Sequence, residues 1–350
     1  LTPAKVVRTY SQYNETSFGE FLVKAPASAL FNSPLPFLPE DGKTFILALA
    51  PDADKDRPAF SFKGKGLFDA AEGGIGGSLA VVGGDYYDSE KYTLEILADG
   101  ATKSGDGYLS LYASDLNAVG ARIMTLGGAA HRVFTTNQST EIQVVAGGAW
   151  PNQSNLSARG FGGIVVREGA VLQGPQVLLV ADRDADILVE QGARITTLGK
   201  GDPAFDSTMG YTLRANNVNL LAVSNGLLEF NSNASAGATG VITVEDGASL
   251  YSDGTLSFVT PGAVSLGENV NYGARYLAFS SGSVNIGTSD ALAAAGANGV
   301  LPSGIALNQS VLDRLMAGDQ STGAPKLERL ILSASQSVNF YGSISLDTRD

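Results

Sequence analysis

Short apolar runs, rich in β-branched residues and leucine, alternate with small and polar residues along most of this chain. In the run Val241-Ile-Thr-Val244, successive side chains would point to opposite sides of an extended strand. Such runs are short and are bounded by glycine and other turn-forming residues. No amphipathic helical pattern recurs, which argues against helical repeats. The pattern therefore predicts an all-β protein.

A short unit recurs between these runs: an apolar strand, usually an acidic residue, then Gly-Ala and another strand. It occurs at Asp99-Gly-Ala101, Glu168-Gly-Ala170, Gln191-Gly-Ala193 and Asp246-Gly-Ala248. Together with Gly120, the glycines are separated by one or two-and-a-bit steps of about 20–24 residues, a period typical of solenoids. Glycine supplies the positive φ that a tight corner needs. The unit is therefore interpreted as a repeated corner.

One near-identity strengthens the repeat. The segment Gly120–Gly127 recurs as Gly192–Gly199 with seven identities in eight positions, which we interpret as two copies of one structural unit. A parallel β-helix, with coils about 4.8 Å apart, is the predicted fold, and Ile195 is predicted to point into its core. A two-sheet sandwich or a large barrel is the alternative, because hairpin signals occur at Asn225-Gly226 and Asn298-Gly299.

Two regions depart from the pattern. Residues 1–75 contain several prolines and no Gly-Ala unit, and they are predicted to form irregular loops or strands packed on a solenoid of residues 76–350. A helical insertion is expected at about 288–326. Its first helix would follow the cap Ser289 and stop at Gly296. Its second would run from about Gln309 to Gly318 with an apolar face docked on the rod.

Composition and charge narrow the function. The formal net charge is −12, and Lys and Arg do not cluster, so nucleic acid is not an expected partner. No run of 18 apolar residues occurs, so no membrane-spanning segment is predicted. Cysteine is absent from all 350 positions, which suits a bacterial chain exported unfolded through the periplasm. The start at Leu1, with no Met and no signal-peptide pattern, and the abrupt end at Asp350 indicate an internal fragment.

Catalytic chemistry finds little support. Polygalacturonase-like β-helix enzymes need Gly-His-Gly and Arg-Ile-Lys, and neither tripeptide occurs. The sole histidine, His131, has no acidic neighbour in sequence that could orient it as a base. We therefore predict that the chain is not an enzyme. A polysaccharide-degrading β-helix enzyme remains the less favoured alternative.

Two acidic runs are candidate cation sites. Asp52-Ala-Asp-Lys-Asp56 and Asp182-Arg-Asp-Ala-Asp186 would each place three carboxylates on one side of an extended segment, where Ca²⁺ could bind. The second run offers Asp182, Asp184 and Asp186 as ligands. Both runs also contain a basic residue, so solvated turns with internal salt bridges are the simpler interpretation. No other cofactor or metal is predicted.

Tyrosines in the N-terminal part are the candidate binding residues. Tyr86, Tyr87 and Tyr92 would form an aromatic strip able to stack on sugar rings. The alternative is that several of them pack under the N-terminal loops.

The corner unit Glu/Asp-Gly-Ala-x-Ile/Leu is similar to the repeats of filamentous-haemagglutinin-like exoproteins, which Gram-negative bacteria export by two-partner secretion. The runs Leu301–Leu315 and Leu332–Ser343 resemble a domain found deep within such exoproteins. The resemblance covers most of residues 95–350, whereas residues 1–75 match nothing. It implies a right-handed parallel β-helix, an outer-membrane two-partner secretion transporter as partner, and secretion or display at the cell surface.

Members of that family serve as adhesins, biofilm-matrix binders or sticks for contact-dependent inhibition. The expected function is therefore a structural and adhesive segment that contacts a surface glycan, an exopolysaccharide or a cell-surface receptor. A carbohydrate-binding module within an adhesin is the alternative, and it would differ in having a specific groove.

Overall fold

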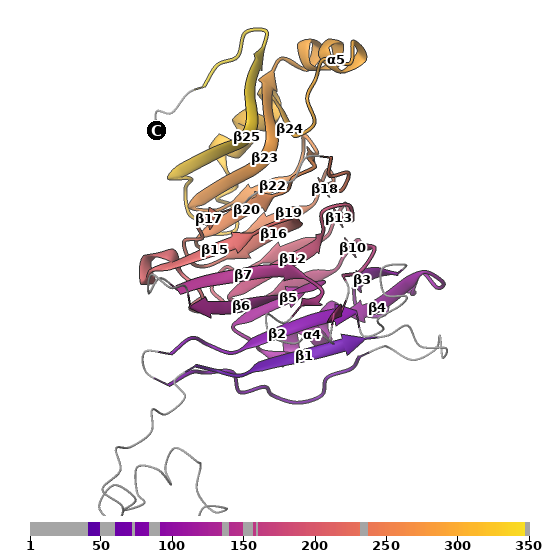
Figure 1. The fold of residues 1–350 in the computed structure, drawn as a ribbon, viewed down its shortest axis with the longest axis vertical. Helices are drawn as coiled ribbons and strands as arrows, with labels where there is room; N and C mark the ends of the chain where they lie inside the picture. Colours follow the sequence, from indigo (N-terminus) through magenta and orange to yellow (C-terminus); the bar gives the residue numbers. More distant parts are fainter. Residues whose placement is uncertain are drawn as a thin grey trace, which may run out of the picture.

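Strands stacked along one long axis build most of this protein (Figure 1), as seen in a computed structural model. The structure describes residues 41–49, 60–71, 74–83, 92–134, 140–149, 157–158, 160–231 and 237–346. These residues form mostly β-strands, together with three α-helices, so the all-β prediction is confirmed. No helix among them is long and apolar enough to cross a membrane.

The first of three ladders is parallel throughout. It comprises β3 (Thr93–Leu97), β10 (Gly163–Val166), β13 (Asp186–Val189), β18 (Val241–Val244), β21 (Ala263–Leu266) and β24 (Ile305–Asn308), with β4 (Tyr108–Tyr112) on the outer side of β3. Ile164 lies beside Ile187, Ile187 beside Ile242, and Ile242 beside Val264, in steps of 23, 55 and 22 residues. The short steps match the predicted period.

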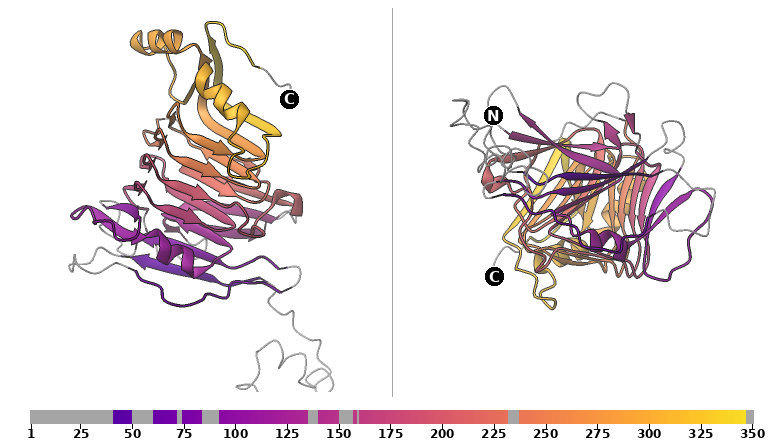
Figure 2. Two further views of the ribbon diagram at one scale, coloured as in Figure 1. Left: turned by 180° about the vertical axis from the view of Figure 1, so that it is seen from behind. Right: turned by 90° about the horizontal axis from the view of Figure 1, so that it is seen from below.

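The second ladder is also parallel. It comprises β11 (Val171–Gln173), β14 (Arg194–Thr196), β19 (Ser249–Tyr251) and β22 (Asn271–Gly273). Each of its strands follows a Gly-Ala corner or the equivalent turn after β21. We use the word layer for one strand from each ladder with the connections between them. Figure 2 shows the layers following one another along the axis.

The third ladder contains the exception to parallel pairing. It comprises β1 (Thr44–Leu49), β2 (Ser78–Gly83), β5 (Ile123–Leu126), β12 (Gln176–Asp182), β16 (Val218–Ser224), β20 (Thr255–Val259), β23 (Tyr276–Gly287) and β25 (Arg329–Tyr341). β16 is antiparallel to both β12 and β20, whereas the other neighbouring pairs are parallel. The expectation that every neighbour is parallel is therefore wrong at β16.

The antiparallel strand arises from an excursion of the chain. After β14 the chain leaves the stack through a 3-10 turn, η3 (Ser207–Met209), and β15 (Tyr211–Ala215). It then reverses at Asn216-Asn217, where Asn217 has φ 54°, a left-handed conformation that asparagine tolerates better than most residues. β16 fills the third ladder in the opposite direction. In the first two ladders, the 55-residue step therefore advances by a single layer. The extra residues belong to the excursion between β14 and β16 and to the connection from β16 to β18.

A smaller sheet covers the outer side of the third ladder. It contains β6 (Gly128–Phe134), β7 (Thr140–Ala146), β15 and β17 (Phe230–Asn231), and β8 (Gly148–Ala149) pairs with β9 (Ser157–Ala158) beside it. Ile142 and Leu213 of this sheet pack against Leu178 and Leu220 of the ladder in a second hydrophobic cluster. This covering sheet was not predicted.

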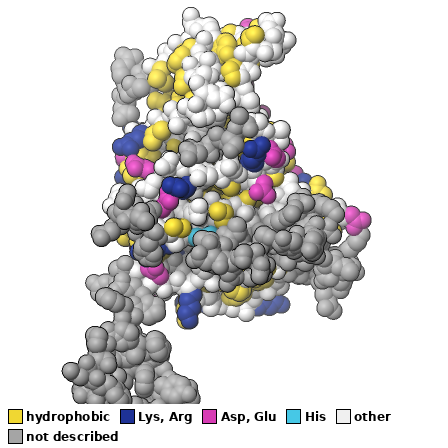
Figure 3. All heavy atoms as spheres, viewed as in Figure 1, with side chains coloured by type: hydrophobic (Ala, Val, Ile, Leu, Met, Phe, Trp, Pro, Cys, Tyr) yellow, Lys and Arg dark blue, Asp and Glu magenta, His cyan; other side chains and the backbone are white. Residues whose placement is uncertain are grey.

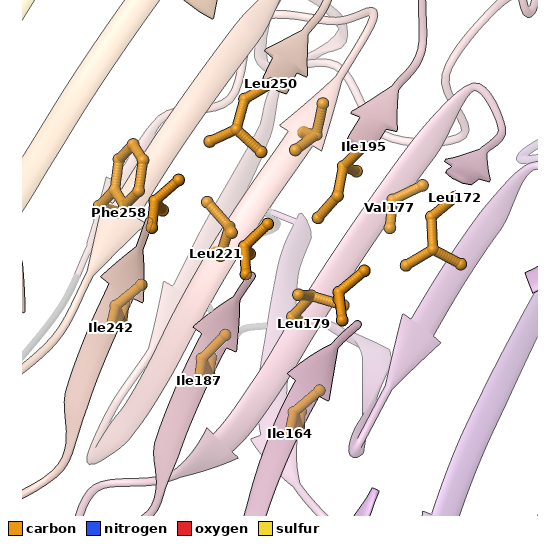
Figure 4. Close-up of a cluster of buried hydrophobic side chains, with 14 of the residues drawn as sticks. Ile164, Leu172, Val177, Leu179, Ile187, Ile195, Leu221, Ile242, Leu250 and Phe258 are labelled. Atoms are coloured by element: carbon orange, nitrogen blue, oxygen red, sulfur yellow. The ribbon is translucent and has the colours of Figure 1, made fainter. Parts of the chain in front are cut away.

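The main core lies between the three ladders. Residues of like size occupy equivalent positions in successive layers, so that Ile195 of β14 lies between Leu172 and Leu250 (Figure 4). Ile195 is fully buried, which confirms that it points inward. Phe258 and Phe279 stack with ring centroids 4.8 Å apart. Burial of these side chains is the main stabilising term for such a stack.

The corners follow the predicted unit. In each of the four Gly-Ala units the glycine has a φ between 74° and 79°. The following alanine amide donates to the carbonyl three residues earlier, for example from Ala193 to Glu190 at 3.0 Å. A positive φ at the third position of such a turn is typical of type II. The repeated corner is therefore confirmed.

The near-identical segments Gly120–Gly127 and Gly192–Gly199 are not equivalent. Gly192 lies in a corner, and the segment continues into β14 of the second ladder. Gly120 instead ends the helix α4 (Ala113–Val119), and its segment continues into β5 of the third ladder. The interpretation of these segments as two copies of one unit is wrong. α4 itself was not predicted.

Helices α5 (Ser289–Ala297) and α6 (Gln309–Ala317) lie in the expected places. The cap of α5 is Thr288 rather than Ser289, because the Thr288 hydroxyl accepts from the Ala291 amide. α6 begins after Asn308 and buries Val311, Leu312 and Leu315 against the core, as its apolar face predicted. β1 lies within residues 1–75 and pairs in parallel with β2.

Candidate functional site

A groove of about 640 Å³ lies beside α4. It is bordered by residues 65–69, by α4 and the segment that follows it as far as Met124, by residues 173–175 at the end of β11, and by Lys200 of the loop after β14. We call it the α4 groove. Its volume falls within the range that is typical of ligand sites.

The charge of the α4 groove is opposite to that of the chain. Among the described residues that line it, Lys65, Arg122 and Lys200 are cations and Asp69 is the one carboxylate. Arg122 Nη2 and Asp69 Oδ1 are 2.7 Å apart, in a pair with both side chains partly exposed. The whole chain carries 35 acidic and 23 basic residues. A local excess of cations on an acidic protein favours an anionic ligand at this place.

Asn117 fixes α4 against the stack. Its Nδ2 donates to the Val171 carbonyl at 2.8 Å, and its Oδ1 accepts from the Gln173 amide at 2.9 Å. Both ends of the side-chain amide thus bind the strand β11. Because each bond uses a different group of one side chain, the helix is held in both position and orientation. Two of the segments that line the groove are therefore joined by this side chain.

Residues 65–69, which form another border of the groove, lie close to α4. A Cβ atom on Gly66 would come within 2.1 Å of the Val119 carbonyl oxygen, so only glycine permits this approach. The Phe62 amide donates to Asp115 of α4 at 2.8 Å. Leu67, 82% exposed, and the partly buried Phe68 add an apolar edge to the groove. This segment therefore gives the groove one cation, Lys65, together with apolar surface.

The tyrosines predicted from the sequence do not form this site. Tyr86 and Tyr87 lie outside the described residues. Tyr92 immediately precedes β3, is partly buried, and its carbonyl accepts from the Gly162 amide at 2.9 Å. Tyr92 is not among the residues that line the α4 groove.

The three aspartates proposed as Ca²⁺ ligands are all exposed, but their carboxylates have different partners. Asp184 accepts from the Thr239 amide at 3.1 Å and from Arg183 Nε at 3.1 Å, and Asp186 accepts from the Val241 amide at 2.8 Å. The Thr239 amide bond, followed by Arg183, lowers the pKa of Asp184. The bonds from Thr239 and Val241 connect the layer of β13 to the layer of β18.

The other residues singled out from the sequence are the acidic run 52–56 and His131. The run Asp52–Asp56 lies outside the described residues. Among the described residues, no three or more His, Cys, Asp or Glu side chains are grouped closely enough to hold a metal ion. His131 lies on β6 opposite Gln143 and is largely buried, and this burial lowers its pKa.

Sequence reasoning missed a buried charge cluster around Glu95 of β3. This fully buried carboxylate accepts from the Ser104 amide at 2.9 Å, the Ser104 and Ser110 hydroxyls at 2.6 Å, and Arg167 Nε at 3.0 Å. Arg167 also binds Glu190 at 2.6 Å and lies over the Tyr108 ring. Burial alone would raise the pKa of Glu95, but these hydrogen bonds together lower it. The signal in the sequence was one acid inside the apolar run Thr93–Leu97.

Comparison of the chain with protein-family models, with curated proteins and with solved structures returned no match.

Proposed function

We propose that this chain is a structural and adhesive segment of a secreted bacterial surface exoprotein, built as a right-handed parallel β-helix. In this proposal each layer is one coil, and the rod mediates contact between cells, with a host or with a biofilm matrix. Its partners would be a two-partner secretion transporter in the outer membrane and a surface glycan, exopolysaccharide or cell-surface receptor. The resemblance of the corner units to filamentous-haemagglutinin repeats supports this proposal.

One observation carries the proposal: the same three ladders recur layer after layer on a continuous apolar core. Such a stack extends along one axis and presents its outward side chains in regular rows. A chain with this geometry acts through reach and surface contact. Hydrogen bonds that Asp184 and Asp186 accept from the next layer help to hold neighbouring layers of the rod together.

A carbohydrate-binding module is the second candidate function, and the α4 groove is the observation that favours it. A groove of ligand size that is lined by three cations and bordered by an exposed leucine differs from a regular rod surface. The two candidates are compatible, since a binding site can be carried on a rod.

An adhesion assay on the purified chain tests the proposal. Beads coated with the chain should retain bacterial or epithelial cells, or isolated exopolysaccharide, above the level of beads coated with an acidic globular protein of equal charge. Incubation with polysaccharides should release no reducing or unsaturated ends. Retention equal to that of the control beads, or catalytic release of such ends, would contradict the proposal.

A further inference from the structure

We infer that the α4 groove is a binding site for an anionic oligosaccharide, whose rings carry carboxylate or sulfate groups. The inference rests on the proposed function, because contact with a cell surface or matrix makes a saccharide the relevant anion. It adds a place on the molecule, a ligand class and the side chains that recognise it.

The cations provide the first argument. Lys65 and Lys200 are exposed and stand on separate segments that border the α4 groove. Two ammonium groups on different borders can engage two anionic groups along a chain of sugars. Because the rest of the protein is acidic, an anion is repelled from most of the surface and attracted here.

Arg122 provides the second argument. Among the described residues, Asp69 is the one hydrogen-bond partner of the Arg122 side chain, through Nη2, while a guanidinium presents five N–H donors in a planar fork. Asp69 therefore holds the side chain in place and leaves donors for a planar carboxylate or a sulfate oxygen. Arg122 Nη1 lies close to Gly201, in the loop that contains Lys200. A Cβ atom added to Gly201 would be 3.2 Å from this nitrogen. The guanidinium is thus positioned between Asp69 and the Lys200 loop.

The uncharged lining provides the third argument. Sugar rings present hydroxyl groups at their edges and C–H groups on their faces. Gln173 offers an amide for hydroxyl groups, and the exposed Leu67 offers an apolar surface for a ring face. A simple inorganic anion needs neither. The combination of cations, amide and apolar surface therefore favours a saccharide.

Direct titration with defined saccharides tests the inference. The probes are a fluorescently labelled tetragalacturonate, a sulfated heparin-derived tetrasaccharide and a neutral galactose tetramer, each followed by fluorescence anisotropy. At least one anionic tetrasaccharide should bind at least tenfold more tightly than the neutral one, and its affinity should fall as salt is added. The tighter of the two anionic probes identifies the charged group that the site prefers.

Charge reversal places the site. The double variant Lys65→Glu, Lys200→Glu should lose at least tenfold in affinity for the anionic probe. The matched control Lys43→Glu, Lys326→Glu makes the same change in net charge at exposed lysines outside the α4 groove and should stay within twofold of the parent chain. Unchanged melting temperatures establish that both variants are folded, as expected for exposed side chains.

Three outcomes would overturn the inference: no binding of either anionic probe, equal loss in the groove and control variants, or tighter binding of a single-stranded oligonucleotide of equal charge. The adhesion assay separates this inference from the proposed function. If the parent chain binds the probe but retains no cells, the site stands and the proposed function fails. If the chain retains cells but binds neither probe, the α4 groove inference fails alone.

Discussion

At each Gly-Ala corner the chain turns through a backbone conformation that side chains with a Cβ atom rarely adopt. Gly192 has φ 74°, and a Cβ atom there would also touch Glu168 of the neighbouring layer at 3.4 Å. Alanine at this position would force the turn either to keep a left-handed conformation or to open. The corner therefore requires a residue without a Cβ atom.

We expect Gly192→Ala to lower the free energy of unfolding by about 1–2 kcal/mol, the cost of a left-handed residue with a Cβ atom. Gly296→Ala is the control, because Gly296 lies exposed in the helix α5 with no atom closer than 3.9 Å to the added Cβ. There alanine should leave stability unchanged or raise it by up to about 1 kcal/mol. Urea unfolding followed by circular dichroism measures both values. Equal effects of the two changes would contradict the role of the corner.

The position of Ile195 tests the register of the second ladder. Its side chain is fully buried between Leu172 and Leu250, so Ile195→Asp places a carboxylate where it has no partner. We expect a loss of several kcal/mol, comparable with the total stability of many domains. Ile195→Val should cost only about 1 kcal/mol, since it removes one methylene group. Unchanged urea unfolding of Ile195→Asp would mean that the register is wrong.

Single residues were predictable from the sequence where the local backbone conformation determines the residue type, and were not predictable where the role depends on the surrounding elements. The Gly-Ala corners were predictable because a tight turn with positive φ requires glycine wherever it occurs. The nearly identical segments at Gly120 and Gly192 were misleading. Both contain a glycine of positive φ followed by a strand, and eight residues do not encode whether the chain before them is a helix or a strand.

At the scale of elements, the Glu95 cluster joins three strands of the first ladder. Glu95 of β3 binds Arg167, which directly follows β10, and Arg167 binds Glu190, which directly follows β13. Ser104, in the loop between β3 and β4, donates its amide and its hydroxyl to the same carboxylate. The cluster thus holds the loop between β3 and β4 against the stack through hydrogen bonds to one charged group.

The cluster predicts a dependence of stability on pH. Because the pKa of Glu95 is lower in the folded than in the unfolded chain, its contribution is present above the unfolded value of about 4.3 and is lost as pH falls through the folded value. Glu95→Gln should therefore cost about 2 kcal/mol at pH 7 and much less at pH 3. Urea unfolding at the two pH values measures this difference.

Glu328→Gln is the matched control for this prediction. Its carboxylate is about half exposed and lies 3.5 Å from Arg275. An exposed pair of this kind contributes little, so the variant should stay within about 0.5 kcal/mol of the parent chain at both pH values. An equal loss for Glu95→Gln at pH 7 and pH 3 would show that its effect is packing rather than charge.

The strand β16 shows the limit of pattern reasoning at this scale. Its apolar run, Val218–Ser224, reads as a strand, and it is a strand. Its direction is set by the preceding reversal at Asn216-Asn217 and by the length of the excursion after β14. Alternation of side chains is the same for parallel and antiparallel neighbours, so the sequence pattern did not distinguish them.

At the scale of the whole molecule, the sequence pattern did not predict the α4 groove, because its lining residues are far apart in the sequence. Its lining comes from residues 65–69, 114–124, 173–175 and Lys200, which the folding of several layers brings together. No spacing along the chain relates Lys65 to Lys200. The predicted tyrosines were chosen because they are near in sequence, whereas the cations meet only in space.

The two ends of the stack differ in what covers them. Residues 60–71 loop beneath β1 at the N-terminal end (Figure 2), and Phe60, Phe62 and Phe68 pack against the main core. At the C-terminal end, β23 is the one described strand that pairs with β25, and the apolar side chains of β25 remain at least partly exposed, including Phe340 at 64%. On the face shown in Figure 3, hydrophobic side chains are visible around this end, while most of the charged groups lie further down.

This asymmetry predicts a gradient of local stability along the axis. Each layer bonds only to its neighbours, so an end strand lacks one of the two partners that hold an inner strand. Six of the seven residues of β12 are buried, whereas those of β25 alternate between exposed and partly buried. Amide hydrogen exchange, measured by mass spectrometry at pH 7, should therefore be slowest in peptides of β12, β14 and β20 and fastest in those of β25.

The variant Ile195→Asp sharpens this prediction because it weakens one inner layer. If the layers are coupled only to their neighbours, exchange should rise first in peptides of β11, β14 and β19, before the change reaches β25. Control exchange in Ile195→Val should differ little from the parent chain. Equal protection of β12 and β25, or a rise of the same size in all peptides of Ile195→Asp, would mean that the stack opens as a single cooperative unit.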